Sequence, residues 1–307
     1  MRILAIVNPT AGGGLTKKIW PSLALKIKNS IGSFECTFTS NPGHGKLIAR
    51  QEAARCDLIL AVGGDGTASE VASGIIESGS HCEFSLLHCG TGGDFRKAIG
   101  LAANPIEALK QLAKGTTHTI DAGEMTYTAE NGQKQSRYFI NIASFGLAGE
   151  VATLVNRSSK SLGGTLSFAL ATLHAAMCYE NPEVTFRIDN SDSFRCKITN
   201  VSIANGKYFG GGMLISPKSR LDDALFDIVV VRALSKTDLL RNIHRLYLGT
   251  HLELPYVGHR RGKLLTAEPA SSNAIVRIEV DGEVPGRLPA SFRILENALQ
   301  IRVPKTS

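Results

Sequence analysis

The stretch LILAVGGDGTASEVASGI, Leu58–Ile75, decides the fold, because five apolar residues run directly into the turn GGDGT and a helix-like apolar pattern follows at once. A short apolar run bounded by glycines is typical of a buried strand. Glycine lets a backbone approach a ligand closely, and phosphate is the usual ligand of such loops. Asp65 lies among these glycines, and an acidic residue fits an anion site only if a metal ion or a proton transfer is involved.

The first hundred residues repeat this pattern. Segments with helical spacing separate four short apolar runs, Ile3–Val7, Phe34–Phe38, Leu58–Val62 and Phe84–Leu87. Apolar strands that alternate with helices indicate a parallel sheet covered on both faces, so we predict an N-terminal doubly wound α/β domain. In a parallel sheet the turns after the strands gather at one edge, where open α/β sheets bind ligands. Those turns are NPTAGGG, TSNPGHG, GGDGT and GTGGD.

The pattern changes near Met125. Strand-like segments dominate from there, such as YFINIASF at 138–145 and the alternating IVRIEV before Asp281. Helical stretches interrupt them at 147–156, 164–179 and 236–248. We therefore predict a C-terminal domain of mostly antiparallel β structure with packed helices, and a functional cleft between the two halves.

The composition is that of a globular chain of about two domains, with 307 residues of which 43% are hydrophobic and 20% charged. The net charge of +7 favours anionic partners, with a solvated basic surface as the open alternative. Because no run of five like charges occurs, we expect no nucleic-acid partner.

The chain also lacks the features of a secreted or membrane-spanning protein. Its N-terminal apolar run is too short for a signal peptide, and the apolar segment 162–179 is interrupted and shorter than a membrane span. The cysteines show neither a C-x-x-C pair nor zinc spacing, so we expect buried, reduced thiols of an intracellular protein. They are Cys36, Cys56, Cys82, Cys89, Cys178 and Cys196.

The GGDGT turn has two interpretations. Its glycines remove side chains that would repel a polyphosphate, and Thr67 can cap the next helix, whose N–H groups point at the same anion. The alternative is a tight turn without a ligand, and the three similar loops at the same edge favour the anion site. The chain has no Walker A motif, and the NPTAGGG turn differs from a dinucleotide fingerprint.

Acidic residues at three places are candidate metal or catalytic groups. Asp94 ends the fourth strand as Asp65 ends the third, which suggests a magnesium–nucleotide complex, unless both carboxylates cap helix N-termini. The turn SRLDDALFD could hold a cation, with an exposed acidic turn as the alternative. Asp281-Gly282-Glu283 ends an alternating strand, and spacing alone favours a hairpin turn there.

In this order the motifs resemble those of the diacylglycerol kinase catalytic-domain family, in particular its soluble bacterial lipid kinases, which are related to sphingosine kinases and more distantly to NAD kinases. NPTAG is similar to the family's N-P-x-x-G, TSNPGH to T-x-x-x-G-H and GTGGDF to G-T-x-N-D-F. NGKYFGGG and LDD are similar to its N-G-x-x-x-G-G-G and L-D-D-G, and GGDGT and DGE match directly. GGDGT alone is shared with phosphofructokinases and NAD kinases, but the ordered set is specific and runs nearly end to end.

The resemblance implies roles for individual residues. Asp281 would be the general base that takes the proton from a lipid hydroxyl, and Asp65 and Asp94 would organise Mg²⁺ and water around the phosphates. The implied ligands of a second, structural Mg²⁺ are the Asp223 carboxylate and the backbone carbonyls of Arg220 and Leu225. The implied ATP site comprises Asn8, Pro9, Thr10, Ala11, Gly12, Thr39, Gly63, Gly64, Asp65, Gly66, Thr67, Ala68, Ser69 and Thr91.

The resemblance further implies an ATP- and Mg²⁺-dependent lipid kinase of NAD kinase/diacylglycerol kinase-like fold, which converts diacylglycerol to phosphatidate in phospholipid biosynthesis. The expected domains are 1–123 with 291–307 for ATP and 124–290 for the lipid. We expect a cytoplasmic enzyme in peripheral contact with an anionic membrane surface, and a homodimer stays open. NAD kinase-like phosphorylation of a nucleotide, or a non-catalytic nucleotide- or lipid-binding regulator, are the alternatives.

Several positions depart from the family pattern, and they bear on nucleotide preference and rate: His88 stands for Pro, Gly93 and Ser69 for Asn, and Ala224 for Gly. The acceptor lipid stays open among diacylglycerol, sphingoid bases, ceramide, monoacylglycerol and phosphatidylglycerol. Candidate walls of an apolar lipid groove are Leu147–Val155 and Leu166–Tyr179, with core helices as the alternative. Candidate contacts to anionic headgroups are Lys17, Lys18, Arg157 and Lys160.

Overall fold

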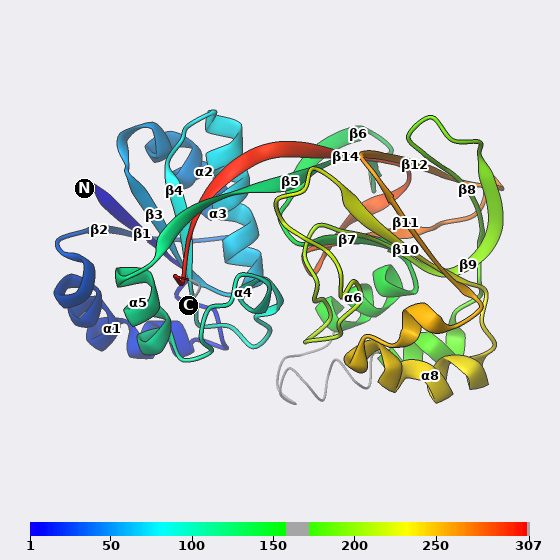
Figure 1. Ribbon diagram of the computed structural model, residues 1–307, viewed down its shortest axis with the longest axis horizontal. Coiled ribbons are helices and arrows are strands. Elements are labelled where there is room, and N and C mark those ends of the chain that lie inside the picture. Colours follow the sequence, from blue (N-terminus) through cyan, green and yellow to red (C-terminus); the bar gives the residue numbers. More distant parts are fainter. Residues whose placement is uncertain (158–171, 306–307) are drawn as a thin grey trace. The chain divides into compact units, whose positions relative to one another are not determined.

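The computed structural model describes residues 1–157 and 172–305 (Figure 1). The chain forms two compact units, Met1–Asp121 with Glu296–Ser307, and Ala122–Leu295.

The first unit contains a parallel sheet of five strands in the order β2-β1-β3-β4-β14. Every neighbouring pair is parallel, and the predicted strand–helix alternation is confirmed. The first two strands of this order, β1 and β2, have Val7 opposite Phe38, and β3 is buried along its whole length. The strands are β1 Ile3–Val7, β2 Glu35–Phe38, β3 Leu58–Gly63, β4 Glu83–His88 and the end of β14 Glu283–Val303.

Helices connect these strands: α1 Leu15–Ile31, α2 His44–Glu52, α3 Asp65–Ser78, α4 Asp94–Ala98 and α5 Pro105–Ala113, with a 3₁₀ turn η1 Ala53–Arg55. The α3 helix packs closely on α2, because a Cβ added to Gly74 would lie 2.3 Å from the Lys46 carbonyl oxygen. Its apolar side, including Val71 and Ile75, is fully buried.

The second unit is built from antiparallel strand pairs. Six strands of this unit pair in a closed ring, in the order β7-β9-β8-β12-β14-β13 and back to β7. Each of these six strands therefore has a partner on both sides. The strands are β5 Thr116–Ala129, β6 Lys134–Phe139, β7 Ile142–Gly146, β8 Glu183–Ile188, β9 Phe194–Ala204, β10 Phe226–Arg232, β11 Val257–Gly262, β12 Leu264–Pro269, β13 Arg277–Val280 and β14.

One large apolar cluster fills this unit and includes two stacked phenylalanine pairs. The Phe139 and Phe226 ring centroids lie 5.6 Å apart, and those of Phe145 and Phe292 lie 6.1 Å apart. This core comes from inward-facing positions of alternating strands, such as the buried positions of β8.

Helices α6 Leu147–Arg157 and α8 Lys236–Leu248 pack in the second unit (Figure 1). A helix at 172–178 lies with them, and the 3₁₀ turn η3 His251–Glu253 follows α8. The part of the predicted helix at 164–171, and Lys160, lie outside the described residues. Among the described residues, no helix is both long and apolar enough to cross a bilayer.

Two expectations are corrected. The segment 138–145 is not one strand, because the chain leaves β6 at Phe139 and enters β7 at Ile142. The cysteines are all free, but only Cys56, Cys82 and Cys89 are buried: Cys196 is partly buried, and Cys36 and Cys178 are exposed. Cys36 lies on the edge strand β2, and Cys178 is the last residue of the helix at 172–178.

Candidate active site

The loops after β1, β3 and β4 touch through their backbones at the carboxyl edge of the parallel sheet. A Cβ added to Gly12 would lie 2.4 Å from the Cys89 carbonyl oxygen, and one added to Gly90 would lie 2.7 Å from the Gly64 Cα. Gly12 also has a φ of +62°, which disfavours other residues. Glycine is therefore required here by the meeting of the loops, before any ligand is considered.

Asn8 joins the first loop to the third. Its side-chain amide donates to the Thr67 hydroxyl at 3.0 Å, and its carbonyl oxygen accepts the Thr10 backbone N–H at 3.0 Å and the Thr10 hydroxyl at 2.8 Å. The predicted residues Asn8, Thr10 and Thr67 are thus brought together. Thr39 lies on the second loop, where its N–H donates to the Val7 carbonyl oxygen at 2.9 Å.

In the four helices that follow these loops, the N-cap residue itself supplies no side-chain cap. Their N-cap residues are Gly14, Gly43, Gly64 and Gly93. By contrast, the side chain of Asn104 caps α5 and that of Ser235 caps α8. The first N–H groups of a helix have no intrahelical acceptor, and the helix dipole attracts negative charge to them. An edge with several such helix ends is a ready site for phosphate oxygens.

Carboxylates of α3 already occupy two of these helix ends. Asp65 accepts the N–H of Gly93 at 2.6 Å and that of Phe95 at 3.3 Å, at the start of α4. Glu70 accepts the N–H of Gly43 at 2.7 Å and that of Gly45 at 3.0 Å, at the start of α2. For Asp65 this geometry is the alternative in which the carboxylate caps a helix N-terminus instead of binding a metal ion. The N-termini of α1 and α3 are then the two that a ligand could occupy.

Sequence reasoning missed Glu70. The available signal was its position one turn after GGDGT, as a charged residue among the small and apolar residues of that turn. Its partners lie 25 and 27 residues away, so only the contact between α2 and α3 identifies its role.

The remaining predicted residues of this edge have distinct surroundings. Asp94 is buried at the start of α4, with a carboxylate oxygen 3.7 Å from the Lys97 ammonium. Ser69 is buried, and its hydroxyl makes no hydrogen bond to any described residue. Thr91 is exposed. Burial lowers the pKa of His88, at the end of β4, while the Asp65 carboxylate opposes this shift.

In the second unit, Asp281 and Gly282 form the two-residue turn between β13 and β14. Both have positive φ, +46° and +91°, as a type I′ hairpin requires, so the turn interpretation is confirmed. The Asp281 carboxylate also accepts the N–H groups of Ile140 and Ile142, each at 3.2 Å. These bonds explain the break between β6 and β7.

The Asn205-Gly206 motif reaches the same break. Asn205 is fully buried and donates its side-chain N–H to the Ile140 carbonyl oxygen at 2.9 Å, and the backbone N–H of Gly206 donates to the Asn141 carbonyl oxygen at 2.9 Å. On the other side of the turn, Glu279 accepts the Gly282 N–H at 2.7 Å. The Asn205-Gly206 motif therefore holds the segment whose N–H groups orient the Asp281 carboxylate, although Asn205 and Asp281 lie 76 residues apart in the sequence.

The acidic turn of the second unit is a partly buried charge network. The Arg261 guanidinium contacts one Asp223 carboxylate oxygen, while the other oxygen is buried and makes no hydrogen bond in the described part of the chain. Asp227 is buried and accepts from His259 Nε2 at 2.6 Å. The Asp222 carboxylate instead pairs with the Arg220 side chain at 3.1 Å. The buried Asp223 oxygen is a ligand type that suits a hard cation, and Ala224, at φ +58°, bends the backbone beside it.

The expected groove walls pack against one another in the described residues. Leu147 and Val151 of α6 form an apolar cluster with Ala175, and Leu239 of α8 packs on it. For these residues the structure therefore shows the core-helix alternative. The remainder of the predicted second wall, 166–171, lies outside the described residues.

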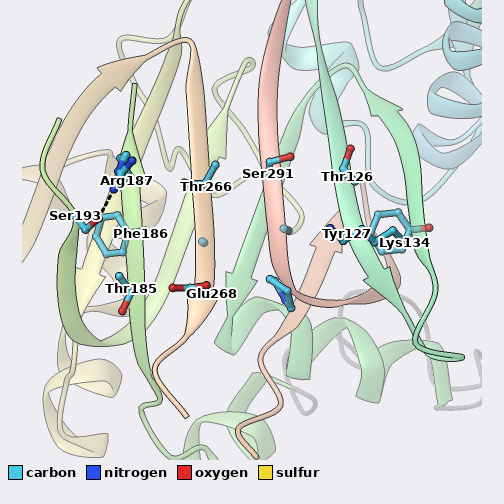
Figure 2. Close-up of a pocket in the computed structure, with 13 residues that line it drawn as sticks. Thr126, Tyr127, Lys134, Thr185, Phe186, Arg187, Ser193, Thr266, Glu268 and Ser291 are labelled. Atoms are coloured by element: carbon cyan, nitrogen blue, oxygen red, sulfur yellow. Dashed lines mark hydrogen bonds between the residues drawn. The ribbon is translucent and has the colours of Figure 1, made fainter. Parts of the chain in front are cut away.

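The second unit also has a pocket of about 300 Å³ on the sheet made by β5, β6, β8, β12 and β14 (Figure 2). Hydroxyl groups line much of it, including those of Thr126, Thr266 and Ser291, and Arg187 donates to the Ser193 hydroxyl at 3.2 Å. None of the predicted site residues lines this pocket.

The chain is similar to known proteins over nearly its full length. A diacylglycerol kinase of Staphylococcus epidermidis (strain ATCC 12228 / FDA PCI 1200) is 28% identical over 306 residues, which cover 99% of this chain and 92% of that protein. A diacylglycerol kinase of Staphylococcus carnosus (strain TM300) is 26% identical over 305 residues, covering 99% and 95%.

Solved structures show the same fold. One crystal structure of a protein from Bacillus anthracis str. Sterne has a TM-score of 0.81 at 23% identity and covers 98% of this chain and 95% of that chain. A second from the same organism, described as a diacylglycerol kinase, has a TM-score of 0.74 at 20% identity and covers 98% and 96%.

Two family descriptions match consecutive parts of the chain. The diacylglycerol kinase catalytic domain matches residues 2–125, and the YegS C-terminal NAD kinase beta sandwich-like domain matches residues 141–303. The first match contains the glycine-rich loops at the carboxyl edge of the parallel sheet, and the second contains the Asp281 turn. The chain therefore belongs to the diacylglycerol kinase catalytic-domain family, with the YegS-type C-terminal domain.

Proposed function

We propose that the chain is an ATP-dependent lipid kinase that transfers the γ-phosphate of ATP to a lipid hydroxyl, with diacylglycerol as the acceptor and phosphatidate as the product. One observation carries this proposal: four helices with glycine N-caps start at the carboxyl edge of the parallel sheet, and two of them, α1 and α3, begin without a side-chain cap. The choice of a lipid as the acceptor is supported by the family to which the chain belongs and by its relatives, which are named diacylglycerol kinases.

The phosphates of ATP would bind at the ends of α1 and α3. The other two helix ends carry the carboxylates of Asp65 and Glu70, which would repel a phosphate there. The loop residues from Asn8 to Gly12 and from Gly63 to Ser69 would therefore line the triphosphate, with Thr39 and Thr91 beside them. These roles follow from helix-end charge and from backbone access through glycine.

Asp281 would act as the general base. Its carboxylate is oriented by two backbone N–H donors in a rigid hairpin turn, an arrangement that positions a base without further rearrangement. The hydroxyl oxygen of the lipid would form a bond to the γ-phosphorus as the bond to the bridging oxygen of ADP breaks. The hydroxyl proton would pass to the carboxylate, and ADP and the phosphorylated lipid would leave.

Magnesium would neutralise phosphate charge when bound with ATP, which is the chemistry that phosphoryl transfer needs. Asp94 is the buried carboxylate of the phosphate edge that would face this ion, with Asp65 in a supporting position. The Asp223 carboxylate and the backbone carbonyls of Arg220 and Leu225 would hold a second, structural ion. The unbonded buried oxygen of Asp223 supports that assignment.

We further propose that the first unit binds ATP and that the second unit binds the lipid. The enzyme would be cytoplasmic and would meet its substrate at the membrane surface, as its lipid acceptor requires.

The decisive experiment incubates the chain with labelled ATP, Mg²⁺ and vesicles that contain one candidate lipid at a time, with NAD in a parallel lipid-free reaction. We expect labelled phosphatidate from diacylglycerol. If only NAD became labelled, the activity would be nucleotide phosphorylation and not lipid phosphorylation. If no product became labelled under conditions in which a known lipid kinase works, the proposal would be contradicted.

Asp281→Asn tests the base with a matched control. We expect a loss in kcat of about 10²–10⁴-fold with ATP affinity retained. Asp189→Asn is the control, because Asp189 also has positive φ, +49°, and its carboxylate also accepts two backbone N–H groups, from Lys263 at 2.9 Å and Leu264 at 2.8 Å. Equal losses in both variants would show that only the turn matters and would remove Asp281 from the mechanism.

A further inference from the structure

The α8 helix buries no residue fully, although it has 13 residues and a regular N-cap. Its inner side makes partial contacts, with Leu239 against the α6 cluster and Leu246 against the cluster around Val229. The Ser235 hydroxyl accepts the Asp238 N–H at 3.1 Å, so the start of the helix is firmly set. The helix is thus held along one side and leaves the other side open.

The open side of α8 carries large apolar residues. Leu240 is 41% exposed, Tyr247 51% and Leu248 66%. Residues seven and eight positions apart lie on the same face of a helix, so these three form one stripe. Apolar residues usually face inward on a surface helix, whereas this helix carries them on its outer side as well as on its inner side.

Two cations share this face. Lys236 lies four residues before Leu240 and Arg241 follows Leu240 directly, and both are exposed. The acidic residue of the helix, Asp238, accepts a hydrogen bond from the Ser235 hydroxyl at 2.6 Å at the helix start. Exposed apolar side chains flanked by Lys and Arg are the pattern of a helix that lies in the plane of an anionic membrane surface.

The helix at 172–178 extends this surface. Its Leu173 and Met177 are exposed and lie four residues apart, so they share one face. The Lys236 ammonium donates to the Met177 carbonyl oxygen, which joins the two helices. Together they present five large apolar side chains.

We propose that this surface, defined as Leu173, Met177, Lys236, Leu240, Arg241, Tyr247 and Leu248, binds an anionic lipid bilayer. The proposal rests on the proposed function, which requires the enzyme to reach an acceptor inside a bilayer. Charge complementarity selects the occupant: a bilayer with anionic headgroups neutralises the flanking cations and accepts the apolar stripe. Helix α8 is about 20 Å long, at 1.5 Å per residue, and would lie along the surface.

Vesicle sedimentation of the full chain tests the surface without using activity. The probe is vesicles of phosphatidylcholine with 30% phosphatidylglycerol, compared with pure phosphatidylcholine. We expect the double variant Leu240→Glu/Leu248→Glu to bind the anionic vesicles at least about tenfold more weakly. Two apolar side chains are lost, and the two carboxylates that replace them are repelled by the anionic headgroups. The matched control is Leu25→Glu on α1, which is 65% exposed and should bind as the wild type does.

Two further variants keep the test independent of folding. Leu248→Glu alone changes the last residue of α8, and we expect a smaller loss of binding with unchanged circular dichroism. Arg241→Gln should reduce the salt dependence of binding, because it removes a cation and no apolar contact. Wild-type binding by both the single and the double leucine variants would overturn the proposal.

Kinase assays with monomeric, short-chain diacylglycerol separate this proposal from the proposed function. The double variant should phosphorylate the short-chain lipid at the wild-type rate and the vesicle lipid more slowly. If the wild type binds vesicles through this surface but phosphorylates no lipid, the kinase proposal fails and the surface stands. If the double variant only converts a dimer to a monomer in sedimentation velocity and still binds vesicles, the face joins two copies of the chain and the membrane proposal is wrong.

Discussion

The Asp65 carboxylate accepts the backbone N–H of Gly93 at 2.6 Å, across 28 residues of sequence. The first residue of α3 thus holds the first turn of α4, and the two glycine-rich loops act as one structural element. This contact explains why an acidic residue lies in the glycine-rich loop: it supplies the negative charge at the start of α4.

Replacing Asp65 should destabilise this edge. We expect Asp65→Ala to lower the free energy of unfolding by about 0.5–2 kcal/mol, as for loss of a helix cap, and Asp65→Asn to cost less because one acceptor oxygen remains. Urea unfolding measures both. Asp222→Ala is the control, because its surface pair with Arg220 should contribute little. If Asp65→Ala left the free energy of unfolding unchanged, the hydrogen bonds from α4 to Asp65 would not contribute to stability.

Glu70 should hold the second loop rigid. Glu70→Gln keeps one acceptor oxygen where two N–H groups need acceptors, so we expect hydrogen exchange at Gly43 and Gly45 to speed up about 5–30-fold. Glu77→Gln on the same helix is the matched control, since Glu77 pairs with the Lys46 side chain at 2.7 Å and not with the loop. Equal exchange rates in the two variants would exclude Glu70 as the loop anchor.

Gly12 and Gly13 separate steric from conformational requirements. Both have positive φ, +62° and +65°, but an added Cβ meets the Cys89 carbonyl oxygen at Gly12 and nothing within 4 Å at Gly13. We expect Gly13→Ala to cost about 1–2 kcal/mol from the backbone alone and Gly12→Ala at least about 1 kcal/mol more from the clash. Thermal unfolding checks the order, and a reversed order would contradict the packing of these loops.

His251 should make stability depend on pH. Burial lowers its pKa from 6.5, its side chain is 2% exposed, and its Nε2–H donates to the Ile215 carbonyl oxygen at 2.9 Å. The folded state therefore binds fewer protons than the unfolded chain, so this contribution is present above about pH 6.5 and is lost as the pH falls below it.

Urea unfolding at pH 7.5 and 5.5 measures this effect, which reaches at most about 1.4 kcal/mol per pH unit for one group. His251→Gln keeps an N–H donor and cannot titrate, so we expect a smaller drop in stability between the two pH values than in the wild type. An identical drop would assign the dependence to other groups, such as the buried His88.

Much of the fold could be predicted because its signals are local. Strand length, helical spacing and glycine turns repeat within about 30 residues, and parallel strands necessarily bring their following turns to one edge. For that reason β1, β3 and the turns after them lie where the apolar runs placed them. The Asp281 turn was visible for the same reason, since a D-G pair after an alternating strand is a hairpin signal.

The sequence by itself determined the order of the elements, the edge at which the glycine-rich loops gather and the family, because each depends on neighbouring residues or on motif order. Only the tertiary structure decided that Asp65 and Glu70 cap other helices, that the chain breaks between Phe139 and Ile142 to bond Asp281, and that α8 turns an apolar stripe outward. Each of these is a contact or an exposure set by segments far apart in the chain. Periodicity shows that a helix has an apolar face, but only packing determines which face is covered.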